Sequence, residues 1–67
     1  MRFHIPQMTC GHCVRTLRNA MEAAFPGAPV TIDLDRRELD VDVEAAERPR
    51  LVGAIQDAGY ESVPIER

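Results

Sequence analysis

The chain has 67 residues, of which eight are basic and eleven are acidic, and its formal net charge is −3 at pH 7. This length holds a single domain, which we assign to residues 1–67, and an acidic domain with only 4% aromatic residues is a poor candidate for nucleic-acid binding. Because we find no secretion leader and no apolar run near the roughly 20 residues of a membrane span, we expect no membrane insertion and a cytoplasmic protein with reduced thiols.

The first strand and the first helix are predicted on either side of a short polar segment. Apolar and polar side chains alternate in residues 2–6, so Phe3 and Ile5 are expected to face the core. Residues 14–24 have helical spacing, and the side chains expected to be buried are Val14, Leu17, Met21 and Ala24. Both cysteines lie between these elements, in Met8-Thr9-Cys10-Gly11-His12-Cys13. Unpaired N–H groups at the start of a helix favour thiolate over thiol, so the cysteines should deprotonate readily.

A hairpin with one polar face is predicted after the helix. Pro26 and Gly27 end the helix, because proline cannot continue it and glycine supplies a left-handed turn. Residues 30–34 and 39–43 alternate around a polar turn, which indicates two strands with one exposed face. That face would carry three mutually repelling carboxylates, those of Asp33, Asp40 and Asp42.

The C-terminal part predicts a second helix and a last strand. The helix runs from about residue 48 to residue 58, with Pro49 in its first turn and Gly59 after its end. Residues 60–65 are expected to form an edge strand, where Pro64 is tolerated. The order strand, helix, strand, strand, helix, strand predicts an α+β fold of the ferredoxin-like βαββαβ type, with two helices on one face of a four-stranded antiparallel sheet.

The two cysteines suit a soft metal ion that takes few ligands. A thiolate pair on an exposed loop fits Cu(I), whereas zinc prefers four closed ligands. Zinc stays an alternative because Cys10, Cys13 and His12 offer three ligands. A thiol-disulfide oxidoreductase is the second alternative, since Cys-Gly-His-Cys is also a redox tetrapeptide. The short chain and the absence of tryptophan argue against that second alternative.

Met8-Thr9-Cys10 and Cys13 after a first strand, together with residues 57–60 (Asp-Ala-Gly-Tyr), resemble the heavy-metal-associated (HMA) domain family. That family includes bacterial copper chaperones and the N-terminal domains of metal-pumping P-type ATPases. The resemblance implies that Cys10 and Cys13 bind the metal, while Met8 packs beneath the loop without binding it. It also implies that Tyr60 lies close to the metal loop.

Other polar residues near the motif are expected to assist the site without binding metal. Thr9 is expected to bond to the turn backbone or to cap the helix. His12 is expected to face solvent, with tuning of the thiolates as the alternative. The family's strand order would set Arg2 and His4 beside the carboxylates of the third strand, so His4 is interpreted as a cross-strand partner. A thioether ligand at Met8 is the alternative to core packing.

The resulting hypothesis is a copper chaperone, not an enzyme, that carries one Cu(I) and passes it by ligand exchange to the metal-binding domain of a P-type copper-transporting ATPase. Arg15 and Arg18 are expected to meet an acidic patch on that partner. We expect a monomer when metal is absent, with a metal-bridged dimer left open. Transport or sensing of zinc, mercury or silver stays open, and so does a detached ATPase domain, although Met1 and the end at Arg67 favour a free-standing protein.

Overall fold

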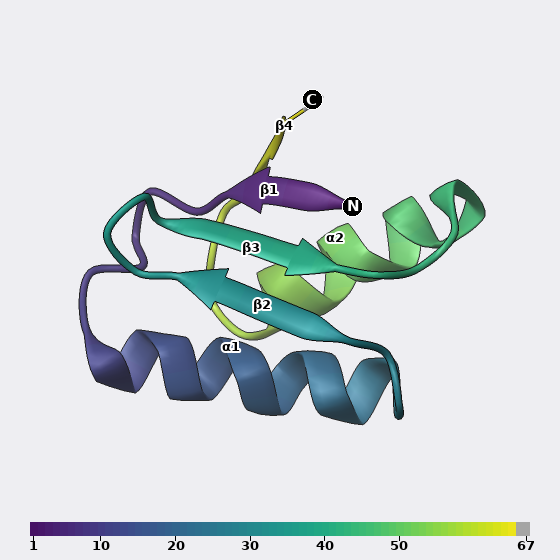
Figure 1. The fold of residues 1–67 in the computed structure, drawn as a ribbon, viewed down its shortest axis with the longest axis horizontal. Helices are drawn as coiled ribbons and strands as arrows, with labels where there is room; N and C mark the ends of the chain where they lie inside the picture. Colours follow the sequence, from purple (N-terminus) through teal and green to yellow (C-terminus); the bar gives the residue numbers. More distant parts are fainter. Residues whose placement is uncertain (66–67) are drawn as a thin grey trace.

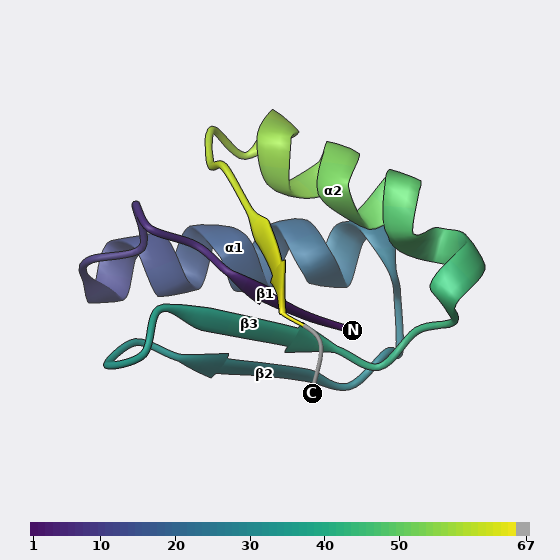
Figure 2. The same cartoon turned by 90° about the horizontal axis from the view of Figure 1, so that it is seen from above.

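The computed structural model describes residues 1–65, in which one antiparallel sheet is covered on one face by two helices (Figures 1 and 2). The sheet order is β2-β3-β1-β4, so the first strand lies beside the third as expected. The ferredoxin-like arrangement predicted from the sequence is therefore confirmed. In chain order the elements are β1 (Arg2–His4), α1 (Gly11–Ala24), β2 (Val30–Asp33), β3 (Glu38–Val41), the short 3-10 helix η1 (Ala45–Glu47), α2 (Arg48–Asp57) and β4 (Val63–Ile65).

The core lies between the sheet and the helices. Among residues 1–65 it contains no buried polar or charged residue, and its members are Phe3, Ile5, Met8, Leu17, Met21, Phe25, Leu39, Val41, Leu51 and Ile55. Each large apolar side chain removed from water in this way contributes about 1.5–3 kcal/mol. Helix α1 buries Leu17 and Met21, but Val14 and Ala24 are only half-buried at the margin of the core, contrary to the expectation.

Two element boundaries differ by three residues from the sequence expectation. Helix α1 begins at Gly11 and not at residue 14, because the Val14 N–H already donates to the Cys10 carbonyl at 3.2 Å. Strand β4 covers Val63–Ile65 and not residues 60–65. The N–H groups of Tyr60 and Glu61 donate to Ile55 and to the Gln7 side chain, so they are not available to pair with β1. Neither helix of residues 1–65 has the length and hydrophobicity needed to cross a membrane.

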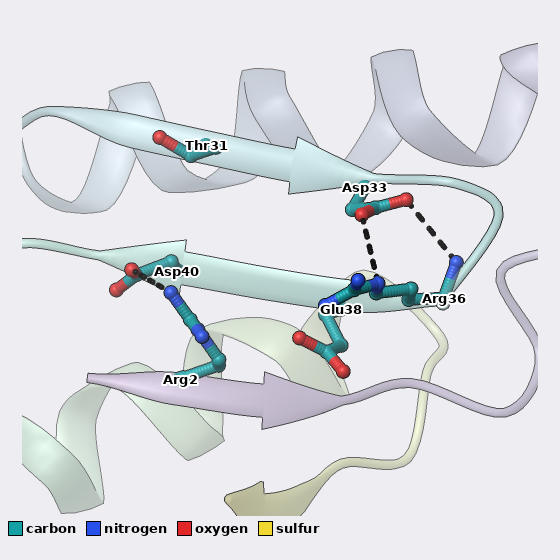
Figure 3. Close-up of a pocket in the computed structure, with 6 residues that line it drawn as sticks. All are labelled: Arg2, Thr31, Asp33, Arg36, Glu38 and Asp40. Carbon is teal, nitrogen blue, oxygen red and sulfur yellow. Dashed lines mark hydrogen bonds and ion pairs between the residues drawn. The ribbon is translucent and has the colours of Figure 1, made fainter. Parts of the chain in front are cut away.

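The outer face of the sheet carries two of the three predicted carboxylates, those of Asp33 and Asp40, together with arginines that offset their repulsion (Figure 3). Arg2 lies opposite Asp40 in the strand register, and its Nη2 atom is 3.2 Å from Asp40 Oδ2. On the neighbouring turn, Arg36 Nε lies 3.8 Å from Asp33 Oδ2. Such exposed pairs contribute at most about 1 kcal/mol each.

His4 and Asp42 were also predicted for this face, but only His4 lies in a strand of the sheet. His4 lies opposite Glu38, a carboxylate other than the three that were expected. Asp42 falls after the end of β3, and its N–H donates to the Pro29 carbonyl at 3.0 Å. Asp42 is therefore not part of the pairing between β2 and β3.

The turn between β2 and β3 lies at the same end of the molecule as the loop that joins β1 to α1 (Figure 2). We call this loop, residues 5–10, the cysteine loop. The turn between β2 and β3 contacts it through Arg37, whose backbone has a φ of 57°. The Arg37 carbonyl accepts the Ile5 N–H at 2.7 Å, and Arg37 Nη1 donates to the Pro6 carbonyl at 3.3 Å. The start of the cysteine loop is thus fixed to the hairpin.

Candidate metal centre

The two cysteines are placed by the start of α1. Cys10 is the N-cap residue, with an extended backbone at φ −154° and ψ 169°, and Cys13 lies in the first helical turn. The Thr16 hydroxyl donates to the His12 carbonyl at 2.9 Å and supports this turn. The two sulfur atoms are 3.3 Å apart, close enough to share a proton. The sequence prediction placed both cysteines before the helix, which is wrong for Cys13.

Both sulfurs are accessible and neither is in a disulfide. Cys10 is exposed and Cys13 is half-buried, and both thiols are free. The Cys10 side chain makes no cap hydrogen bond to the helix, so it is not held by the backbone N–H groups of the first turn. An incoming ligand can therefore reach this sulfur without opening the core.

The thiol of Cys13 is acidic. Its pKa falls from the ordinary value of 9.0 to about 7, first because the Tyr60 hydroxyl beside its sulfur stabilises the thiolate. The Thr9 N–H and the Cys10 thiol act in the same direction. Hydrogen bonds to the charged form stabilise the thiolate. The sequence predicted an acidic thiol from the helix start, whereas the largest contribution comes from a residue at the other end of the chain.

Tyr60 follows α2 and comes close to the cysteine loop, as the family resemblance implied. It is half-buried and packs against the core, while its hydroxyl lies beside the Cys13 thiol. That thiol is the main reason why the pKa of Tyr60 is raised. The apolar ring of Tyr60 thus contributes to packing, while its hydroxyl acts on the Cys13 thiol.

Met8, Thr9 and His12 surround the cysteines in different ways. The Met8 side chain is 0% exposed and belongs to the core, as expected for packing beneath the loop. Thr9 does not cap the helix, because Cys10 occupies that position, and its N–H helps to lower the pKa of Cys13. His12 is exposed, and within residues 1–65 no three His, Cys, Asp or Glu side chains converge into a metal-binding group.

Gln7 is a residue of the site that the sequence analysis missed. Its side-chain oxygen accepts the Glu61 N–H at 2.7 Å, and its carbonyl accepts the Cys13 thiol at 3.8 Å. A lone exposed glutamine before Met8 carries no pattern from which this contact could be inferred, because its partner is distant in the sequence.

The arrangement as a whole offers two soft sulfur donors at the start of α1, with a tyrosine hydroxyl beside one of them. Two-thiolate sites of this kind suit soft ions that accept low coordination numbers. Hard cations prefer oxygen ligands, which are absent from the pair. The donor set therefore fits a monovalent soft metal better than a closed zinc site.

Comparison with known proteins gives one family and several solved structures. The heavy-metal-associated domain model matches residues 2–61. A search of curated proteins found no significant match. The copper chaperone Atx1 from Synechocystis PCC6803, in a trimeric His61Tyr form, has a TM-score of 0.84 at 25% identity, covering 94% of this chain and 98% of that one.

Two further solved structures are similar to this chain and are described with other metals. A gold binding protein has a TM-score of 0.80 at 33% identity, covering 92% of this chain and 94% of that one. The N-terminal domain of ZntA in its Zn(II) form has a TM-score of 0.77 at 27% identity, covering 92% of this chain and 85% of that one. The same fold is thus found with copper, gold and zinc.

Proposed function

This chain belongs to the heavy-metal-associated domain family, and from that premise we propose that it is a copper chaperone that binds one Cu(I) through Cys10 and Cys13. The observation that carries the proposal is the pair of free sulfurs, 3.3 Å apart and accessible at the start of α1. Cu(I) is favoured because it accepts two thiolates without further ligands.

The metal is cargo in this proposal, and the loop has to both hold and release it. A near-linear S–metal–S arrangement needs the sulfurs roughly 4.6 Å apart at about 2.3 Å per metal–sulfur bond. The pair must therefore open from its present separation of 3.3 Å. Cys10 is the sulfur free to move, because its side chain is exposed and unbonded to the helix backbone.

Transfer is proposed to proceed by ligand exchange with a second pair of thiolates. An incoming thiolate bonds to the metal before one of the original sulfurs leaves, so the loop has to be open to a partner. The proposed partner is the metal-binding domain of a P-type copper-transporting ATPase. No bond-making catalysis is needed, and a reducing compartment such as the cytoplasm would keep both thiols available.

An anaerobic titration of the reduced protein tests this proposal. Cu(I) is added in competition with a chromogenic Cu(I) chelator, and Zn(II) is titrated in parallel. We expect one equivalent of Cu(I), held much more tightly than zinc, and loss of that binding in the Cys10→Ser, Cys13→Ser double variant. Tight zinc binding with weak Cu(I) binding would instead assign zinc handling. If neither metal binds, an insulin-reduction assay would test thiol-disulfide exchange.

A further inference from the structure

The segment that carries Tyr60 has no regular structure, so its position depends on individual contacts. Residues 58–62 lie between α2 and β4, and Gly59 has a φ of 95°. The Tyr60 N–H donates to the Ile55 carbonyl at 3.2 Å, which fixes the N-terminal side of this residue to the end of α2. The C-terminal side needs another contact to hold it.

That contact comes from Gln7 in the cysteine loop. The Glu61 N–H, directly after Tyr60, donates to Gln7 Oε1 at 2.7 Å. Gln7 is exposed, so its side chain does not serve the core. Its carbonyl also accepts the Cys13 thiol at 3.8 Å. Gln7 is thus bonded both to Cys13 and to the residue that follows Tyr60, so it links the two residues of the candidate site.

Gln7 is itself held firmly by its neighbours in the chain. The carbonyl of Pro6 accepts Arg37 Nη1 at 3.3 Å. On the other side, Met8 is fully buried and its N–H donates to the Ile5 carbonyl at 3.0 Å. Both neighbours of Gln7 are therefore fixed in place. The bond between Gln7 and Glu61 holds the Tyr60 segment in position against the cysteine loop, which is the more rigid of the two.

We propose that Gln7 is a positioning residue that holds Tyr60 against Cys13 and so slows ligand exchange at that sulfur. This inference rests on the proposed function, because the slowed step is the release of bound Cu(I). Held in place, the tyrosine covers one side of Cys13, and an incoming thiolate has to approach from the side of the exposed Cys10. Gln7 would thereby set which sulfur is replaced first.

The structural half of the proposal is tested on the metal-free protein. Gln7→Ala should raise the hydrogen-exchange rate of the Glu61 amide about threefold to tenfold, the range expected for losing one ordinary hydrogen bond. It should also weaken the NMR contacts between the Tyr60 ring and Cys13, which are unambiguous because the chain has one tyrosine. Gln7→Glu keeps an acceptor and should restore both. Gln56→Ala, at an exposed position of α2, is the matched control.

The functional half is tested by mixing Cu(I)-loaded protein with excess chelator and following metal loss. Gln7→Ala should accelerate the loss about threefold to tenfold, with rescue in Gln7→Glu, but should add little in a Tyr60→Ala background, where no ring covers Cys13. Equal acceleration in both backgrounds, or an unchanged Glu61 amide, would overturn the proposal. If the wild type holds no Cu(I), the proposed function fails, and the metal-free measurements alone decide whether Gln7 positions Tyr60.

Discussion

The Tyr60 hydroxyl lies beside the Cys13 sulfur, so a residue of the segment after α2 acts on the first turn of α1. It is the largest of the influences that bring the pKa of Cys13 to about 7. A thiolate is the form that binds metal, so a lower pKa reduces competition from protons near neutral pH. Tyr60, which lies outside the proposed ligand pair, thus controls the charge of Cys13.

Replacing Tyr60 by Phe should move the titration of Cys13 upward. The wild-type thiol should be half ionised at about pH 7, and the variant should titrate closer to the ordinary pKa of 9.0. The chemical shift of the Cys13 β-carbon in the metal-free protein measures this directly. The ring is kept in the variant, so a shift of the titration reports on the hydroxyl. An unchanged titration curve would show that Tyr60 does not control the charge of Cys13.

The same pKa shift predicts a pH dependence of folding stability. Because the pKa of Cys13 is lower in the folded state, its contribution is fully present above about pH 9 and is lost as pH falls through about 7. Stability of the metal-free protein, measured by urea unfolding, should therefore rise between these values. Tyr60→Phe should flatten that rise, and Cys13→Ser should remove this contribution altogether. An equally steep rise in Cys13→Ser would assign the effect to other groups.

Removing either cysteine should abolish tight Cu(I) binding without unfolding the protein. Cys10→Ser and Cys13→Ser each replace a soft thiolate by a hard hydroxyl, and we expect affinity to fall by orders of magnitude. The fold should persist because neither residue is among the buried core members. Chelator competition measures the affinity, and circular dichroism checks the fold. Undiminished affinity in one variant would remove that cysteine from the site.

Met8 offers a test between core packing and metal ligation. Its side chain is 0% exposed, and Met8→Leu keeps its approximate volume, so the expected loss of stability is below about 1.5 kcal/mol. Because the thioether is not expected to bind metal, the Cu(I) affinity should stay unchanged. A clear loss of affinity in a well-folded Met8→Leu protein would make the sulfur of Met8 a ligand.

Arg50 is predicted to stabilise the end of α1. Its guanidinium donates to the Ala24 carbonyl and lies 4.5 Å from the centre of the Phe25 ring. Losing these two contacts, together with the exposed ion pair between Arg50 and Glu47, should cost about 1–2 kcal/mol. Urea unfolding of Arg50→Ala measures this cost. Arg15→Ala, at an exposed position of α1, is the control. Equal costs for both substitutions would mean that the contacts of Arg50 add nothing.

The fold was predictable because its pattern is local. Alternation in residues 30–34 and helical spacing around Leu17 and Met21 both follow from burial on one face, and the structure reproduces them. The helix start was misplaced because Gly11 and His12 are poor helix markers, and the extended Cys10 that caps the helix has no sequence signature.

The contacts that tune the site were less predictable. The position of Tyr60 could be inferred only through the family resemblance, since its influence on Cys13 links distant parts of the chain. The hydrogen bond between Gln7 and the Glu61 N–H uses a backbone group, which the identity of residue 61 does not reveal. Short edge strands such as β4 likewise depend on where neighbouring N–H groups find acceptors.

The outer side of α1 is predicted to contribute to docking through Arg15 and Arg18. Arg15 is exposed two residues after Cys13, whereas Arg18 Nη1 is bonded to the Val30 carbonyl at 3.4 Å. If an acidic ATPase domain docks here, replacing both arginines by Glu should slow Cu(I) transfer at low salt by about tenfold. Stopped-flow transfer to the metal-binding domain of a copper ATPase measures the rate.

A matched pair of single variants separates docking from net charge. Arg15→Glu and Arg36→Glu change the charge equally, but Arg36 pairs with Asp33 in the turn after β2. Only Arg15→Glu should slow transfer markedly, and the difference should shrink as salt shortens the screening length toward about 3 Å at 1 M. Equal slowing by both variants would mean that the partner responds to the charge of the whole protein, and unchanged rates in the Arg15→Glu, Arg18→Glu variant would place docking elsewhere.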